Sequence, residues 1–178
     1  MSASVTVTGE ASLSNSFLGD TIQVCVVTQE LERTLEGFVR MGIGPWRVYT
    51  FSPETVRDQT YMGEPARYSM RLALATSGTM MWEVIQPLDG PNIYTDFIES
   101  HGEGVHHVGQ SCNGLSYDAQ FEKFAAAGRK MIQSGTWKGV RYAYFSTEDL
   151  IGTTVEIFDF PEGFVFPEPE RWYPARPG

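Results

Sequence analysis

Residues 104–128, GVHHVGQSCNGLSYDAQFEKFAAAG, repeat an order of secondary structure that the chain has already used once. The first part predicts a strand at 104–112, and the spacing of apolar residues in the second part predicts a helix over 116–128. Residues 21–42, TIQVCVVTQELERTLEGFVRMG, predict the same pair, with Thr28 as the N-cap of the helix. The repetition indicates two modules that share an order of elements.

Three further strands are expected after the helix of each half, and a polar loop at 52–65 interrupts the first set. The strands are expected at 21–27, 44–51, 66–76 and 78–88 in the first half and at 104–112, 129–138, 140–147 and 152–160 in the second. Each half therefore follows the order βαβββ. This order predicts an α+β fold in which two tandem modules form a curved, partly closed mixed sheet around a cavity.

The chain is expected to divide into five segments. Residues 1–19 are rich in Ser, Thr and Gly and are expected to form a mobile lead-in, and 20–88 form the first module. A connecting helix lies within 89–103, and 104–160 form the second module. Residues 161–178 contain five of the ten prolines, which cannot donate ladder hydrogen bonds, so an extended arm is expected that packs on the body or on a partner subunit.

Composition excludes several classes of partner. The formal net charge of −9 would repel a phosphate backbone, so nucleic acid is not an expected partner. No apolar run reaches the length of a membrane span, and the N-terminus has no basic or apolar stretch typical of a secretory signal. We therefore expect a cytoplasmic protein in which Cys25 and Cys112 are reduced thiols.

Four polar side chains occupy equivalent positions in apolar strands of the two halves. Gln23 and His107 lie in the first strands, and Glu83 and Glu156 lie in the last strands. The intervals agree apart from the polar loop, with 60 residues between Gln23 and Glu83 and 49 between His107 and Glu156. His106 is expected on the opposite face of the sheet, because adjacent strand residues alternate.

Burying unpaired carboxylates among apolar neighbours costs several kcal/mol, which makes a shared cation the economical explanation. One imidazole nitrogen, two carboxylate oxygens and one amide oxygen suit Zn²⁺, Ni²⁺, Mn²⁺, Co²⁺ or Fe²⁺. We therefore expect a divalent metal ion in the cavity, held by Gln23, Glu83, His107 and Glu156.

The double βαβββ pattern with these four positions resembles the vicinal oxygen chelate superfamily over roughly residues 20–160. That superfamily includes glyoxalase I, methylmalonyl-CoA epimerase, extradiol dioxygenases and bleomycin- or fosfomycin-resistance proteins. The Gln/Glu/His/Glu set is similar to that of eukaryotic-type glyoxalase I. The segment 87–109, which contains GEGVHHVG, resembles the corresponding linker of methylmalonyl-CoA epimerase.

The resemblance implies a metal-dependent isomerase, epimerase or lyase that shifts a proton next to a carbonyl group, with Glu156 as the principal base and Glu83 as its partner. A second glutamate of the epimerases, in the second strand, has no counterpart in PWRVYTF. Two alternatives stay open: a ring-cleaving or other metal-dependent oxygenase, and a non-catalytic protein that binds small molecules. The resemblance also implies a homodimer.

The substrate is expected to be a small carbonyl compound. Basic residues are scattered along the chain, so neither glutathione nor coenzyme A is assured as a cosubstrate, and a more apolar carbonyl compound stays open as the substrate. The pocket is expected to be lined by Trp46, Tyr49, Phe51, Met70, Met81, Trp137, Tyr142 and Tyr144.

Overall fold

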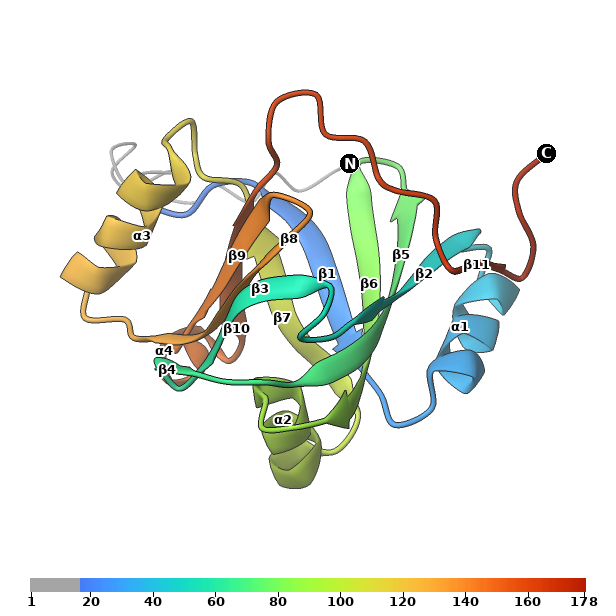
Figure 1. Cartoon of the computed structure of the whole chain (residues 1–178), viewed down its shortest axis with the longest axis horizontal. Helices are drawn as coiled ribbons and strands as arrows, with labels where there is room; N and C mark the ends of the chain where they lie inside the picture. The colour runs from blue at the N-terminus through green and yellow to red at the C-terminus, as the bar shows by residue number, and fades with distance from the viewer. Residues whose placement is uncertain (1–16) are drawn as a thin grey trace, which may run out of the picture.

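The computed structural model describes residues 17–178, and these residues form one mixed sheet of eleven strands with four helices (Figure 1). The strand order is β11-β2-β5-β6-β1-β7-β10-β9-β8-β3-β4. The α+β class and the mixed sheet are thus confirmed. The order has two free ends, at β11 and β4, so the sheet is not closed. The lead-in expected at 1–19 lies almost entirely outside the described residues.

Each half contains the expected elements at nearly the expected places. The first half contains β1 (Thr21–Val27), α1 (Leu31–Arg40), β2 (Trp46–Phe51), β5 (Ser69–Ser77) and β6 (Met80–Asp89). The second contains β7 (Gly104–Gln110), α3 (Tyr117–Ala126), β8 (Met131–Trp137), β9 (Val140–Phe145), α4 (Glu148–Ile151) and β10 (Thr154–Asp159). The connecting helix is α2 (Ile93–His101). The Asn92 side chain caps it by accepting hydrogen bonds from the backbone N–H groups of Tyr94 and Thr95.

The polar segment at 52–65 is not a loop, as the sequence pattern had suggested. It forms β3 (Val56–Tyr61) and β4 (Glu64–Pro65), and β3 pairs with β8 of the second half. The exposed edge of β8 supplies the hydrogen-bonding groups that turn this polar segment into a strand. Local polarity therefore gave the wrong prediction, because the partner strand lies about 75 residues further along the chain.

The first and last strands of each half meet at the centre of the sheet. β1 runs antiparallel to β7, β6 runs parallel to β1, and β10 runs parallel to β7. Two halves with the same internal arrangement therefore face each other across the β1–β7 pair. This places the polar positions of all four strands near one another.

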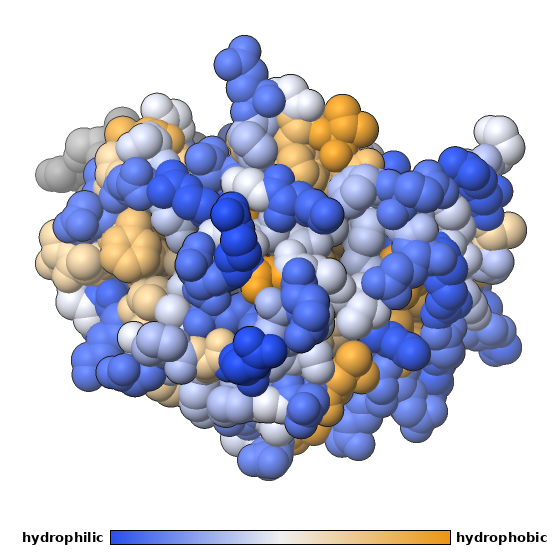
Figure 2. Space-filling model, in the orientation of Figure 1, coloured by the Kyte–Doolittle hydropathy of each residue, from blue (hydrophilic) through white to orange (hydrophobic). Residues whose placement is uncertain are grey.

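The two faces of the sheet bury different residues. On one face α1 packs against β2, β5 and β6, and α3 packs against β9 and β10. These helices lie on opposite sides of the molecule in Figure 1. The other face, called the inner face below, carries the largest apolar cluster, with residues from both halves and from α2. Figure 2 shows mainly hydrophilic side chains on the surface in view, with apolar ones in separate small patches.

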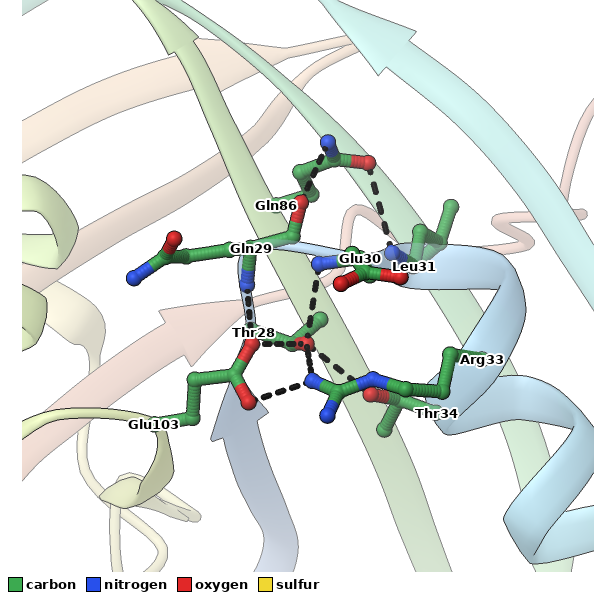
Figure 3. Close-up of polar contacts among 8 residues, drawn as sticks. All are labelled: Thr28, Gln29, Glu30, Leu31, Arg33, Thr34, Gln86 and Glu103. Atoms are coloured by element: carbon green, nitrogen blue, oxygen red, sulfur yellow. Dashed lines mark hydrogen bonds and ion pairs between the residues drawn. The ribbon is translucent and has the colours of Figure 1, made fainter.

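The start of α1 differs from expectation, because the helix begins at Leu31 and Thr28 does not cap it. The Thr28 hydroxyl instead accepts a hydrogen bond from the Glu30 N–H and donates one to Glu103. Figure 3 shows Glu103, which precedes β7, also accepting from the Gln29 N–H and pairing with Arg33. A residue of the connecting segment thus stabilises the end of β1, which local sequence does not reveal.

Candidate functional site

The four central strands bring the predicted polar residues to the inner face. Gln23, Glu83, His107 and Glu156 are all buried. Their positions follow from the pairing of β1 and β7: Cys25 lies opposite both His107 and Glu83, whereas Gly109 lies opposite both Gln23 and Glu156. Each half thus places a small residue across from the polar side chain of the other half. The sequence had given no reason to include Cys25 in the site.

His107 lies between the two carboxylates. Its Nε2 is 3.1 Å from Glu83 Oε2 and 3.3 Å from Glu156 Oε2. Nε2 carries at most one hydrogen, so one hydrogen bond cannot satisfy both oxygens. Glu156 Oε2 is the oxygen left without a hydrogen-bond partner. A buried carboxylate oxygen in this condition costs free energy unless another positive group compensates for it.

The electrostatics of the metal-free site follow from burial and from this arrangement. Burial disfavours the His107 imidazolium, but the close contacts and negative charges of Glu156 and Glu83 outweigh that penalty and raise its pKa to about 9. Burial raises the pKa of Glu156, and the neighbouring His107 only partly offsets this. Burial also raises the pKa of the Cys25 thiol well above its ordinary value.

The donor atoms are spaced as the ligands of one metal ion would be. Two ligand atoms each about 2.1 Å from an ion lie about 3.0 Å apart at a right angle and about 3.4 Å apart in a tetrahedron. The two His107–carboxylate distances fall in this range. The ligand atoms of Cys25, Glu83 and His107 also lie within 4.8 Å of one another. The residues present therefore fit a divalent ion, and a buried Cys/Glu/His triad is one set that can hold it.

Gln23 supplies a further unpaired oxygen. Its Oε1 is buried and has no hydrogen-bond partner, and it packs so closely on Gly109 that a Cβ there would lie 2.6 Å away. Gln23, Glu83 and Glu156 line one pocket, whereas His107 is fully buried. Three of the four predicted ligands therefore line one pocket, and His107 contacts the carboxylates of two of them.

Strand alternation had predicted that His106 lies on the opposite face of the sheet from His107, and this prediction is wrong. A β-bulge in β7 places His107 opposite Cys25 and Val105 opposite Val26, so His106 is the extra residue. It packs against the rings of Tyr94 and Phe97 in α2. Its Nδ1 lies 2.9 Å from Nδ1 of His107. Burial and the nearby His107 charge lower the pKa of His106, so it stays neutral and can orient the other ring.

The pocket at the site has a volume of about 60 Å³. Six of the eight side chains expected to line it do so: Phe51, Met70, Met81, Trp137, Tyr142 and Tyr144. Trp46 lies on the other face of the sheet, packed against Phe38 of α1, because it is out of phase with Phe51 in β2. Tyr49 is on the inner face but lies behind Trp137 and does not line the pocket.

Several further residues line the pocket and were not predicted from the sequence. Leu72 and Leu74 follow Met70 at every second position of β5, so the two-residue period of a strand predicts that they line the same pocket. Phe158, Phe160 and Phe166 also line the pocket, and Val140 completes it. No local pattern places Phe166 there, because it belongs to the arm.

Comparisons with known proteins agree with this fold. A structure of a hypothetical protein from Bacillus halodurans has a TM-score of 0.62 and 16% identity, covering 83% of this chain and 98% of that one. A structure of methylmalonyl-CoA epimerase from Mycobacterium tuberculosis has a TM-score of 0.61 and 14% identity, and the match covers 82% of this chain and 91% of that one. A structure of a Streptomyces coelicolor methylmalonyl-CoA epimerase variant in complex with 2-nitronate-propionyl-CoA has a TM-score of 0.55 and 18% identity, and the match covers 79% of this chain and 96% of that one.

A search of curated proteins found none that matches. At these identities the solved structures support the fold alone. The sequence model of the glyoxalase/bleomycin resistance protein/dioxygenase superfamily matches residues 22–145. Because this match spans most of the chain, the protein belongs to the glyoxalase/bleomycin resistance protein/dioxygenase superfamily.

Proposed function

We propose that the protein is a divalent-metal-dependent isomerase, epimerase or lyase that shifts a proton next to a carbonyl group of a small substrate. One observation carries the proposal: a single imidazole nitrogen lies within 3.3 Å of two buried carboxylates, and one of those carboxylate oxygens has no hydrogen-bond partner. Superfamily membership supports this class of chemistry. The proposal includes a sheet that curves partly around the metal cavity.

In this proposal His107, Glu83, Glu156 and either Gln23 or Cys25 hold the ion. The bound ion would polarise the substrate carbonyl and lower the pKa of the adjacent C–H group. Glu156 is the better base, because burial raises its pKa. The C–H bond breaks, its electron pair moves toward the carbonyl oxygen, and the proton moves to the Glu156 carboxylate.

A second proton transfer completes the reaction. If a protonated Glu83 delivers its proton to the opposite face of the same carbon, the product is an epimer and Glu156 releases its proton to solvent. If Glu156 returns its proton to the neighbouring carbon while the hydroxyl proton of the first carbon passes to the former carbonyl oxygen, the product is an isomer. Glu83 approaches His107 from β6, in the other half of the sheet, and is the second carboxylate available for this step. The apolar walls of the pocket exclude water and so strengthen these electrostatic interactions.

The test combines metal analysis with isotope exchange. Purified protein is expected to take up one equivalent of Zn²⁺, Mn²⁺ or Co²⁺. In D₂O it should exchange deuterium into the C–H next to the carbonyl of 2-hydroxyacetophenone or acetoin. Glu156→Gln should lower the exchange rate by about 10²-fold or more. Glu122→Gln, the same change on the exposed surface of α3, should leave the rate unchanged.

Failure to bind any of these ions would overturn the proposal, as would exchange by Glu156→Gln at the wild-type rate. A second candidate function is non-catalytic binding of a small molecule. The apolar pocket favours it, since all lining residues except Gln23, Glu83 and Glu156 are apolar or aromatic. Saturable binding of a hydroxyketone without deuterium exchange would support this second function.

A further inference from the structure

The chain beyond β10 crosses from one half of the sheet to the other. It leaves β10 at Asp159 and ends in β11 (Arg171–Tyr173), which pairs with β2 of the first half. Figure 1 shows this segment passing over one end of the molecule between these two attachment points. We call residues 160–170 the strap. Two of its aromatic rings, Phe160 and Phe166, line the pocket that contains the carboxylates.

The strap carries a compact set of three phenylalanine rings. The ring centroids of Phe160 and Phe164 are 5.1 Å apart, those of Phe164 and Phe166 are 5.2 Å apart, and those of Phe160 and Phe166 are 5.8 Å apart. Phe160 also contacts Phe158 of β10, and Phe164 contacts Trp137 of β8. The three rings form an aromatic roof over the pocket.

Specific polar contacts hold the far end of the strap. The Glu170 carboxylate accepts hydrogen bonds from the backbone N–H of Thr50 at 2.8 Å and from its hydroxyl at 2.9 Å. The Tyr49 hydroxyl donates to the carbonyl of Pro167 at 2.9 Å. The guanidinium of Arg47 stacks over Phe166, 5.5 Å from the ring centroid. The strap is therefore fixed at both ends, while ring contacts hold its middle.

The pocket beneath the roof suits an uncharged, apolar ligand. Among the described residues that line it there is no Lys, Arg or His, and its polar end contains two carboxylates. Glu83 and Glu156 together balance the two charges of the proposed ion, so a phosphate or carboxylate placed here would lose its hydration without meeting a net positive charge. The volume of about 60 Å³ is roughly the space of two water molecules. The lining therefore favours a compact ligand without a charged group.

We propose that the strap is an aromatic lid on the ligand pocket, and that the ligand is a compact, uncharged aromatic or branched aliphatic carbonyl compound. Its oxygen-bearing end faces Glu83, Glu156 and Gln23, and its apolar part lies under Phe160 and Phe166. The inference deepens the proposed function and rests on it for the oxygen-bearing end of the ligand. It predicts that coenzyme A thioesters and glutathione adducts, which carry phosphates or carboxylates, bind more weakly than such a compound.

Calorimetric titration with three probes tests the proposal: 2-hydroxyacetophenone, propionyl-CoA and S-lactoylglutathione. The metal-loaded wild type is expected to bind the first with one-to-one stoichiometry and the other two at least tenfold more weakly. Phe166→Ala should weaken binding of the hydroxyketone by about tenfold, because part of the ring's contact area is lost. Val165→Ala is the matched control, since Val165 lies on the strap but is 82% exposed.

Phe166→Leu keeps apolar bulk and should retain most of the affinity, which separates loss of the lid from misfolding. Binding of propionyl-CoA as tightly as the hydroxyketone would overturn the proposal. Wild-type affinity in both Phe160→Ala and Phe166→Ala would overturn it as well. Titration of metal-free protein by ligand-observed NMR separates the two proposals. If no metal binds but the hydroxyketone still binds in a Phe166-dependent way, the lid stands and the proposed chemistry fails.

Discussion

Raising the pH of the metal-free protein from about 6 to about 8 will lower its free energy of unfolding by about 2 kcal/mol. The cause is His107, whose pKa in the folded state is about 9, against an ordinary value of 6.5. Its contribution is fully present below about pH 6.5, and it is lost as the pH rises through 9. In that window the folded protein keeps a proton that the unfolded chain releases.

The magnitude follows from the shift of about 2.5 pKa units, which corresponds to about 3 kcal/mol in total, of which about 2 kcal/mol is lost by about pH 8. His107 is completely buried, so solvent screening does not reduce this figure much. The raised pKa of Glu156 acts in the same direction. The measurements stop near pH 8, because an unfolded cysteine begins to ionise above that value.

The assay is urea unfolding in the presence of a chelator, followed by tryptophan fluorescence. An NMR titration of the histidine rings measures the pKa directly. His101→Gln is the matched control: His101 is half-exposed and pairs with Glu148 at the surface, so its loss should leave the pH slope unchanged. An imidazole of His107 that titrates below about pH 7 would refute the reasoning, as would a stability that does not fall between about pH 6 and 8.

Two further predictions concern the neighbours of the ligands. Co²⁺-loaded protein should show a thiolate charge-transfer absorption that Cys25→Ser removes and Cys112→Ser retains; absence of this band from the wild type would leave Gln23 as the fourth ligand. Gly109→Ala should cost about 1–3 kcal/mol of unfolding free energy, since its Cβ would lie 2.6 Å from Gln23 Oε1. Gly104→Ala, where no atom lies within 4 Å of the added Cβ, should cost less than half as much, and equal costs in urea unfolding would contradict the packing explanation.

A bound divalent ion should reverse the pH dependence of stability. The ion requires His107 without a proton on Nε2, so protons compete with the metal and metal affinity rises with pH. His106 is placed to hold His107 in that form, because its neutral Nδ1 can accept a hydrogen bond from Nδ1–H of the neighbouring ring. The local environment therefore supports either a proton or a metal ion at the same nitrogen.

Much of this site was predictable because strands obey a short period. Gln23 in β1 and Glu83 in β6 alternate with apolar residues that lie on the opposite face of the sheet. The pattern within each strand is therefore enough to predict the face on which each polar side chain lies. The same period would have excluded Trp46 from the pocket, since it is out of phase with Phe51. The order of elements in the two halves then predicted that these strands would share one fold.

Other features depended on partners that are remote in sequence. The bulge that turns His106 toward α2 arises from the mismatch of β7 with β1, and the strand β3 exists because β8 is its neighbour. Cys25 joins the site only because antiparallel pairing places it opposite His107.

The sequence by itself therefore determined the α+β class, the duplicated order of elements and the two carboxylates, Glu83 and Glu156, that lie 3.1 and 3.3 Å from His107 Nε2. Only the tertiary structure decided that Cys25 accompanies them, that His106 supports His107 and that Phe166 covers the pocket. The physical reason is that periodicity and propensity act over a few residues, whereas strand register and packing depend on contacts between segments that lie far apart in the chain.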